Sequence, residues 1–360
     1  MKAVIKPRIN LEGRTALETV IPLATPMVLF VDPASACNFQ CSFCPTGDRA
    51  LIAETGRFQG VMSLELFKKV IDDLAAFDRP LKVLRMYKDG EPFLNKNLGA
   101  MIAYAKQSGR CEYIDTTTNA SLMDPERLKP VLDAGLDKIN ISIDGMSRQT
   151  YLDFTKFDID LEKLIANVTW LYEHKGNCEV VIKVPHELVT AEEEARFLRI
   201  FGELSDRIFV ENFAPCWPAF DTEARTGVTI TKGIYEQPIG NTDTCPYIFY
   251  GMSVNADGLV SSCFLDWGRK LIVGDARTEA LSDIWNSAAF NKLRMSHLRG
   301  ERRHNPVCGK CGQLTHCLPD NIDPHRALLI GKMEEHMASL GQDATAEAPD
   351  ARTGRHLPTV

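Results

Sequence analysis

The sequence predicts an α/β protein: a partial (β/α)6 barrel followed by a small α+β domain that carries cysteines. A strand pattern alternates with a helix pattern six times between residues 27 and 213, which is typical of a parallel sheet with right-handed crossovers. This is too few units for a complete eight-fold barrel, so a partial barrel is expected. Beyond residue 240 the alternation stops, and a hairpin with Asp257-Gly258 in its turn begins a region of another kind.

The predicted strands follow apolar runs, and they cover residues 27–31, 81–87, 112–117, 138–143, 179–184 and 207–213. Apolar residues at helical spacing predict the helices between them. Ser63 is the expected N-cap of the first helix, and Asp124 followed by Pro125 begins a later helix that ends near residue 134. The other predicted helices cover 98–107, 161–174, 191–204, 281–285 and 290–298, and the hairpin strands cover 250–254 and 259–262.

These patterns divide the chain into five parts. Residues 1–26 form a polar lead-in with little periodicity, 27–216 the barrel, 217–240 a linker, and 241–325 the second domain. Residues 326–360 are expected to form a C-terminal helix and a tail. Beyond about Gly341 the tail is rich in Ala, Thr and Asp without apolar spacing, so we expect it to be disordered.

Composition narrows the functional classes. The 360-residue chain has 44% hydrophobic and 25% charged residues, and a net charge of -7. This charge argues against a nucleic-acid partner, because phosphate binding needs a basic surface. No apolar run is long enough to span a membrane, and the first 25 residues lack the apolar core of a signal peptide. The eleven cysteines then indicate metal ligands or free thiols in a cytoplasmic protein.

The most informative motif is Cys37-x3-Cys41-x2-Cys44, which directly follows the first predicted strand. A loop this tight can direct three thiolates at one centre. The loop offers no fourth ligand, which suits an iron–sulfur cluster with one iron left open. Structural zinc is the alternative, but it prefers four protein ligands. Unrelated buried cysteines are the remaining alternative.

With an aromatic residue, Phe43, before its third cysteine, this motif resembles the signature of the radical S-adenosylmethionine (SAM) enzymes. The resemblance implies a [4Fe-4S] cluster on Cys37, Cys41 and Cys44, with SAM chelating the open iron. One electron cleaves SAM to methionine and a 5′-deoxyadenosyl radical, which abstracts hydrogen from a substrate. We expect a flavodoxin- or ferredoxin-type protein to supply that electron.

Two strand-end segments continue the resemblance. Gly90-Glu91-Pro92 resembles the family's Gly-Glu-Pro element, in which backbone carbonyls approach the SAM ammonium group. The family usually has a glycine where this chain has Asp89, so that contact is expected to differ. Thr118 and Asn119 end the next strand, where they can bond to a ribose or a substrate. A plain surface turn is the alternative for the Gly90 segment.

Ser142 and Asp144 end the fourth strand and match the family's Ser-x-Asp-Gly pattern. Residues two apart on a strand share a face, so both are expected in the barrel interior near SAM. Asp144 could instead cap the following helix. Lys156 and Arg148, a little further on, are candidates for pairing with the SAM carboxylate or are solvated surface charges.

A second cysteine set follows the barrel. Cys245 and Cys263 flank the hairpin, and Cys308-Gly309-Lys310-Cys311 forms a knuckle, so four thiolates can converge on an auxiliary [4Fe-4S] cluster or on zinc. The spacing resembles the SPASM/Twitch extension of some radical SAM enzymes. Full SPASM domains would carry another cysteine at Asn321, so the single-cluster Twitch form is expected. Cys317 is left as an alternative ligand or a nearby thiol.

Twitch-type relatives include dehydrogenases of aminocyclitol or sugar alcohols, so the resemblance implies oxidation of a small polar substrate. Asp266 is a candidate base near the second cluster, or else a turn carboxylate. Cys216, or Cys317, would make the enzyme an epimerase if it returned a hydrogen atom; an inert buried thiol is the alternative.

Two other functional classes stay open. One is peptide modification, although the lead-in before the barrel is short for a peptide-recognition domain. The other is a non-catalytic iron–sulfur electron carrier or zinc scaffold. Polar residues at the ends of several barrel strands favour an enzyme over that last class.

Overall fold

The computed structural model describes residues 1–9 and 12–344, and its centre is one ten-stranded sheet. The strand order is β1-β7-β6-β5-β4-β3-β2-β8-β9-β10. The six strands from β2 to β7 pair in parallel with their neighbours, which confirms the partial barrel. They are β2 (Val28–Val31), β3 (Val83–Arg85), β4 (Ile114–Thr118), β5 (Lys138–Ser142), β6 (Glu179–Pro185) and β7 (Arg207–Glu211).

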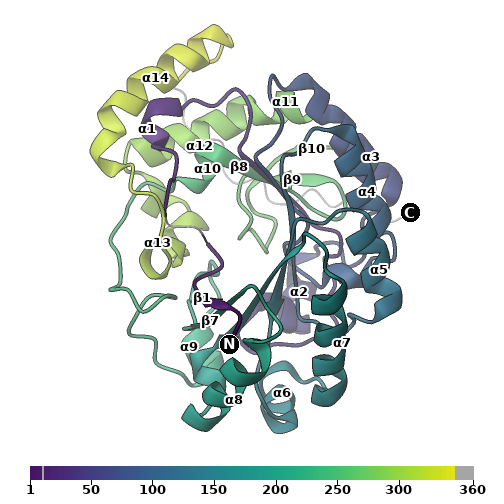
Figure 1. Ribbon diagram of the computed structural model, residues 1–360. Helices are drawn as coiled ribbons and strands as arrows, with labels where there is room; N and C mark the ends of the chain where they lie inside the picture. The colour runs from purple at the N-terminus through teal and green to yellow at the C-terminus, as the bar shows by residue number, and fades with distance from the viewer. Residues whose placement is uncertain (10–11, 345–360) are drawn as a thin grey trace.

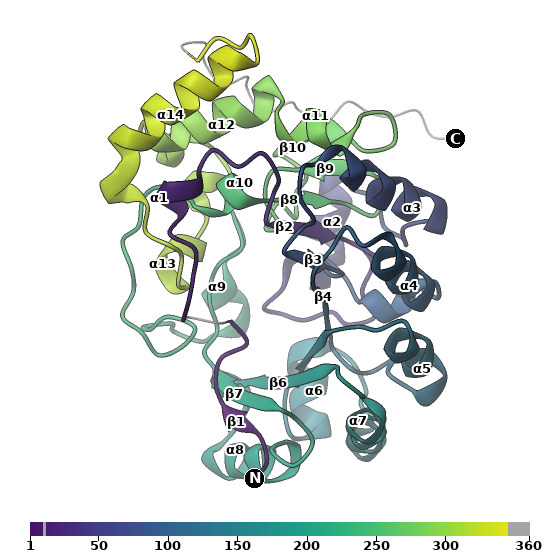
Figure 2. The ribbon, with the colours of Figure 1, turned by 45° about the horizontal axis from the view of Figure 1, so that its top comes forward.

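Helices cover the outer face of this sheet (Figures 1 and 2). Ser63 caps the predicted helix that begins at Leu64 by accepting from the backbone N–H of Leu66, and Asp124 accepts from that of Arg127, as predicted. The sequence pattern missed the shorter helix that precedes Ser63, which begins at Arg49 directly after the cluster loop. The barrel helices are α2 (Arg49–Thr55), α3 (Leu64–Asp72), α4 (Leu98–Ser108), α5 (Pro125–Asp133), α6 (Arg148–Thr155), α7 (Leu161–His174) and α8 (Ala191–Phe201).

The two faces of the barrel strands differ in polarity. Leu84, Ile139 and Ile141 are fully buried in the core that includes the outer helices. The alternate residues belong to the opposite face, where Arg85 of β3 pairs with Asp115 of β4 at 2.8 Å. Polar groups therefore line the side of the sheet away from the helix core.

The N-terminal segment has more regular structure than its sequence suggests. The two-residue strand β1 (Val4–Ile5) pairs in parallel with β7 and extends the sheet, and a short helix α1 (Leu17–Val20) follows. Figure 2 shows this segment running from β7 toward α14. A strand of two residues has no periodicity to detect, which is why the sequence pattern missed it.

The predicted hairpin is present and joins the barrel sheet. β8 (Gly251–Val254) pairs antiparallel with β9 (Leu259–Ser261) and parallel with β2, so the second cysteine region continues from the first barrel strand. The remaining elements of this half are α10 (Tyr247–Tyr250), β10 (Ile272–Asp275), α11 (Leu281–Trp285), α12 (Ala288–Leu298), α13 (Gln313–His316) and α14 (Arg326–Ser339). Between the halves, residues 217–240 contain one short helix, α9 (Thr222–Thr226).

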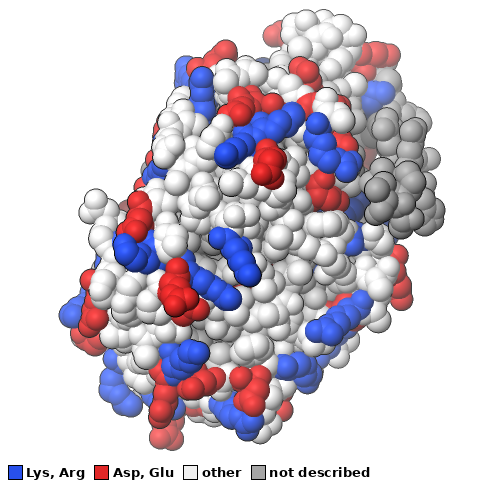
Figure 3. Space-filling model, turned by 90° about the vertical axis from the view of Figure 1, so that its right-hand side faces the viewer, with Lys and Arg blue, Asp and Glu red and all other residues white. Residues whose placement is uncertain are grey.

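The last three expectations are a disordered tail beyond about Gly341, the absence of a membrane-spanning segment, and a surface that is not basic. Gln342 bonds to Asn286 and Asn291, so the chain is placed beyond Gly341, and the rest of the predicted tail, 345–360, lies outside the described residues. Within the described part, no helix combines the length and apolarity needed to cross a membrane. On the described part of the face in Figure 3, acidic and basic side chains are interspersed.

Candidate active site

The loop with the first three cysteines leaves the carboxyl end of β2 and rests on the end of α6. Gln40 and Ser42 donate backbone N–H bonds of 2.8 Å to the carbonyls of Thr155 and Phe154. Burial raises the pKa of Cys37 to about 12, with nearby Glu91 and Cys44 adding to the effect. Burial thus favours the protonated thiol in the metal-free chain, so cluster assembly must release protons.

Gly90 lets two loops approach each other closely. A Cβ at this position would lie 2.0 Å from the carbonyl oxygen of Ala36 and 2.4 Å from that of Ala34, both in the loop that leads to Cys37. Pro92 then begins the 3-10 turn Pro92–Leu94. The Gly90 segment is thus packed against the cluster loop and is not a plain surface turn.

Glu91 is buried and ties this segment to the end of β4. Its carboxylate accepts from the Thr118 hydroxyl at 2.7 Å and from the Asn119 backbone N–H at 2.8 Å. The Asn119 amide in turn donates to Asn38 in the cluster loop at 3.1 Å and lies 3.9 Å from the Cys37 sulfur. These contacts bring the predicted residues of two strands to the first thiol.

Ser142 and Asp144 end β5 next to two further charged residues. Ser142 lies in register with Lys183 of β6, and Lys183 is hydrogen-bonded to Glu211 of β7. Burial raises the pKa of Asp144 to about 7; Lys183 opposes the rise and Glu211 adds to it. Asp144 does not cap the following helix, because the cap of α6 is Ser147. Sequence reasoning passed over Lys183 and Glu211, although both occupy strand positions that share a face.

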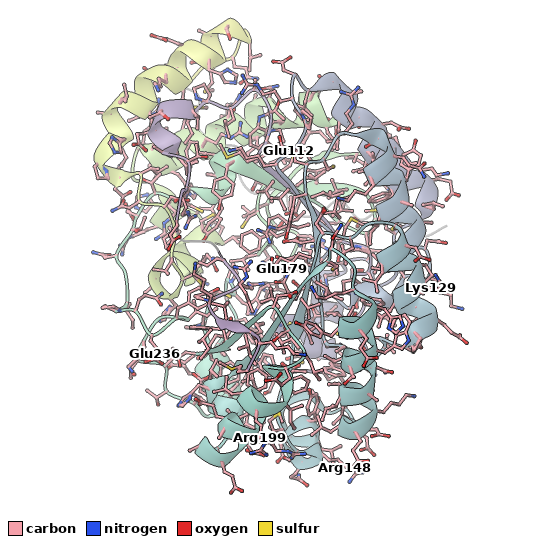
Figure 4. The ribbon with its side chains drawn as sticks, in the orientation of Figure 1. Glu112, Lys129, Arg148, Glu179, Arg199 and Glu236 are labelled. Atoms are coloured by element: carbon pink, nitrogen blue, oxygen red, sulfur yellow. The ribbon has the colours of Figure 1, made fainter. Side chains whose placement is uncertain are left out.

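Three other predicted residues have different surroundings. The Phe43 ring packs against Phe213 beyond β7, with centroids 5.0 Å apart. Lys156 is exposed and donates to the Asp153 carbonyl, and Arg148 pairs with Asp158 on the surface. Figure 4 shows Arg148 at the periphery of the molecule. The structure therefore does not bring Lys156 or Arg148 to the cluster loop.

The second cysteine set surrounds one cavity. Its lining includes the four predicted thiols Cys245, Cys263, Cys308 and Cys311. Burial raises the pKa of Cys245 to about 12, and Cys311 adds to this rise. Arg302 donates hydrogen bonds to the backbone carbonyls of Cys308 and Asp243 and so fixes the knuckle to the segment before Cys245.

Cys317 lies apart from that cavity lining and beside Cys216. Burial raises the pKa of Cys216 well above its ordinary value, and Cys317, Cys311 and Cys44 contribute as neighbours. The Cys311 thiol also lies 3.4 Å from the Cys216 carbonyl oxygen. Together with the Phe43–Phe213 contact, this places the segment that contains Cys216 between the first cysteine loop and the knuckle.

Asp266 holds the loop that follows Cys263. Its carboxylate accepts from the Ser261 hydroxyl at 2.9 Å and from the backbone N–H groups of Lys270 and Leu271 at 2.8 and 2.9 Å. With both oxygens occupied in this way, the side chain is placed to order the loop.

A buried ionic network, missed by sequence reasoning, joins the two cysteine regions. Asp89 contacts Arg57 at 3.0 Å, Lys88 at 3.1 Å and Arg269 at 2.6 Å, and Arg269 also lies 3.8 Å from Asp32. Burial alone would raise the pKa of Asp89, but the three cations outweigh burial and lower that pKa. Arg269 and Arg57 come from distant parts of the chain, so no local pattern signals the network.

The network also makes hydrogen bonds to both cysteine-bearing loops. Arg57 donates to the Thr46 hydroxyl, two residues after Cys44, and to the Trp267 carbonyl. Lys88 donates to the Asp266 carbonyl at 3.4 Å. Among the described residues, no group of three or more His, Cys, Asp or Glu side chains is already arranged to hold a metal ion. The ligand sets therefore stay predictions.

Comparison with known families matches two segments of the chain. Residues 31–198 match the radical SAM superfamily model, and residues 245–312 match the model of the SPASM iron–sulfur cluster-binding domain. The chain therefore contains a radical SAM domain followed by a C-terminal SPASM domain, which supports a radical SAM enzyme. These domains imply SAM, a [4Fe-4S] cluster and auxiliary iron–sulfur clusters.

Among curated proteins, the chain is 33% identical over 110 residues to the Fe-coproporphyrin III synthase of Methanosarcina barkeri. That match covers 31% of this chain but only 25% of the synthase. The AdoMet-dependent heme synthase of the same organism is 21% identical over 338 residues, covering 79% of this chain and 91% of that protein. GTP 3',8-cyclase of Desulforamulus reducens is 29% identical over 130 residues, covering 36% of this chain and 37% of the cyclase.

Solved structures share the fold at low identity. BtrN in complex with AdoMet and 2-DOIA has a TM-score of 0.56 at 17% identity, covering 82% of this chain and 97% of BtrN. Streptococcus suis SuiB bound to the precursor peptide SuiA has a TM-score of 0.59 at 14% identity, and the match covers 84% of this chain and 73% of SuiB. Native anSMEcpe with bound AdoMet has a TM-score of 0.54 at 15% identity, and the match covers 88% of this chain and 100% of anSMEcpe.

Proposed function

We propose that this chain is a radical SAM oxidoreductase that dehydrogenates an alcohol of a small polar substrate, a sugar or an aminocyclitol. The observation that carries the proposal is the single four-thiol cavity, with Cys317 outside its lining. One auxiliary cluster suits the Twitch form, whose relatives include such dehydrogenases. The likeness to BtrN, which was solved with AdoMet and 2-DOIA, is consistent with a small ligand.

We assign the cofactor contacts to residues at the strand ends. Cys37, Cys41 and Cys44 would hold the first cluster, and Cys245, Cys263, Cys308 and Cys311 the auxiliary one. SAM would lie against Gly90, Asn119, Ser142 and Asp144, while Glu91 and Thr118 keep the Asn119 backbone in place. When bound, SAM and the clusters supply the radical that removes a hydrogen atom and the acceptor for the remaining electron.

The chain itself must accept the hydroxyl proton and orient the substrate. Oxidising an alcohol to a ketone removes one hydrogen atom, one proton and one electron, so a basic group near the substrate is needed. We assign this role to the Lys183–Glu211 pair at the ends of β6 and β7, in preference to Asp266, whose oxygens are occupied. The charges of Lys183 and Glu211 both affect the pKa of Asp144, which supports a position of this pair beside the proposed SAM site.

Two other reactions are each favoured by one observation. The segment that contains Cys216 lies between the first loop and the knuckle, a place from which a thiol could return a hydrogen atom and make the enzyme an epimerase. The likeness to SuiB, solved with a precursor peptide, favours peptide modification. A flavodoxin- or ferredoxin-type reductant would serve all three reactions.

The test is anaerobic turnover of the reconstituted chain with SAM and a panel of deuterated aminocyclitols, sugars and short peptides. Dehydrogenation of a substrate labelled at the attacked carbon removes one deuterium and one hydroxyl hydrogen, so we expect a product lighter by about 3 Da, with the deuterium in 5′-deoxyadenosine. An epimerase would instead replace the abstracted deuterium with a hydrogen atom derived from ordinary water in a Cys216-dependent manner, so its product would be lighter by about 1 Da. A product formed only from peptides would overturn the small-molecule assignment.

A further inference from the structure

The wall of the auxiliary cavity contains a histidine. His297 of α12 lines this cavity together with Cys245, Cys263, Cys308 and Cys311. Its exposure is 0%, and neither Nδ1 nor Nε2 has a hydrogen-bond partner among the described residues. A buried polar group without a partner is costly, so native proteins seldom keep one without a reason.

The rest of the cavity wall does not satisfy the imidazole. The carboxylate of Asp266 accepts from its own loop, and Arg302 donates to backbone carbonyls. The other lining residues are the apolar side chains of Pro218, Ile248, Leu271, Val307 and Leu314. The imidazole carries at least one N–H donor in either protonation state, so the ring has a donor that no protein group in the described part of the cavity accepts.

We propose that His297 is a positioning residue of the auxiliary cluster, whose ring N–H donates a hydrogen bond to a sulfur of that cluster. The inference rests on the proposed assignment of the four cysteines as its ligands. Sulfide and thiolate sulfurs accept hydrogen bonds, and such bonds stabilise the more negative, reduced state of a cluster. His297 therefore raises the reduction potential of the auxiliary cluster.

Direct ligation by His297 is not required, because four thiolates already complete a [4Fe-4S] cluster. The side chain is fully buried on α12 and lines the cavity of the four thiols, so it faces the proposed cluster site. The remaining role is to set the electronic properties of the cluster. This would tune how readily the auxiliary cluster takes an electron.

The potential is best measured in a chain in which Cys37, Cys41 and Cys44 are all replaced by Ala, so that only the auxiliary cluster contributes. In this background, His297→Leu removes the donor, while His297→Gln keeps an N–H. The matched control is His304→Leu, an exposed histidine near the same knuckle. Midpoint potentials come from redox titration followed by electron paramagnetic resonance.

We expect His297→Leu to lower the midpoint potential, His297→Gln to restore most of it, and His304→Leu to leave it unchanged. An unchanged potential in His297→Leu would overturn the inference, and so would nitrogen hyperfine coupling strong enough to show direct ligation. If the background chain binds no cluster at all, the four-cysteine assignment itself fails, which is a distinguishable result.

A second measurement is the thermal unfolding temperature of the metal-free chain, which His297→Leu should change in the direction opposite to the midpoint potential. Without a cluster, the His297 ring is an unsatisfied buried group, so replacing it with Leu should raise the thermal unfolding temperature. A residue that merely supports the fold would lower that temperature instead. Increased stability without metal, together with a lower potential with metal, is the combination that the hydrogen bond predicts.

Discussion

Arg269 Nη2 lies 2.6 Å from a carboxylate oxygen of Asp89, and the two side chains are only 7% and 0% exposed. Arg269 belongs to the loop after Cys263, and Asp89 precedes Gly90 in the loop after β3. The ion pair therefore connects the two halves that carry the proposed clusters. At the position of Asp89 the family usually has a glycine, so this chain has placed a carboxylate where cations of both halves meet.

Replacing Asp89 should destabilise the whole chain. Asp89→Asn leaves Arg57, Lys88 and Arg269 buried with Asp32 as their remaining carboxylate neighbour, and breaking a buried pair typically costs about 3–5 kcal/mol. The free energy of unfolding can be measured by urea denaturation. The control is Asp133→Asn. Asp133 forms an ion pair of 2.7 Å with Lys129, and the side chains of Lys129 and Asp133 are 67% and 62% exposed, so we expect the free energy of unfolding to fall by less than about 1 kcal/mol. Equal losses in the two variants would contradict the network's role.

Gly90→Ala should disturb the first cluster. The added Cβ would meet the carbonyl oxygens of Ala36 and Ala34 at 2.0 and 2.4 Å, so the cluster loop must move. We expect weaker iron retention and less 5′-deoxyadenosine from SAM. The control is Gly331→Ala in α14, where a Cβ meets nothing within 4 Å and should stabilise the helix by about 0.5–1 kcal/mol. Normal iron retention in Gly90→Ala would show that the loops are not closely packed.

Iron counting separates the cysteine sets. The wild-type chain should bind about eight irons, as two [4Fe-4S] clusters. Replacing Cys37, Cys41 and Cys44 with Ala should leave about four irons and abolish SAM cleavage. Replacing Cys308 and Cys311 should remove the other cluster. Cys317→Ala should keep both, because Cys317 lies outside the auxiliary cavity lining. Loss of iron from Cys317→Ala would make it a ligand.

The sequence was informative wherever chemistry is local. Both cysteine motifs, the strand-end polar residues and the Ser63 and Asp124 caps depend on close spacing along the chain, and each could be read directly. The pairing of β8 with β2 could not, because the two strands are more than 200 residues apart in sequence.

The ionic network was missed for a related reason. Arg57, Asp89 and Arg269 come together only when the halves are assembled, and each alone is an ordinary charge. His297 was missed because a histidine in a helix has no local feature that reveals what it faces. For Lys156 the sequence left two possibilities open, and its exposed side chain favours the surface charge.

Glu91 makes stability depend on pH. Burial raises its pKa from 4.5 to about 7, although bonds from Asn119, Thr118 and Phe93 oppose the rise. The folded chain then holds this proton more tightly than the unfolded chain. Its contribution to stability is fully present below pH 4.5 and is lost as the pH rises through 7. The loss amounts to about 3 kcal/mol at most.

Glu91→Gln cannot ionise, so it should remove this dependence. The amide loses one of three hydrogen bonds, that from the Asn119 backbone, at a pH-independent cost of about 1 kcal/mol. Wild type should therefore be the more stable chain below about pH 4, by about 1 kcal/mol, the two chains should be about equal near pH 5, and wild type should be the less stable one near pH 8, by about 2 kcal/mol. Urea unfolding of the metal-free, reduced chain across this range gives the comparison. Glu162→Gln, at an exposed position in α7, should follow wild type throughout. A constant difference between wild type and Glu91→Gln would mean that Glu91 titrates normally and is not desolvated at the barrel mouth.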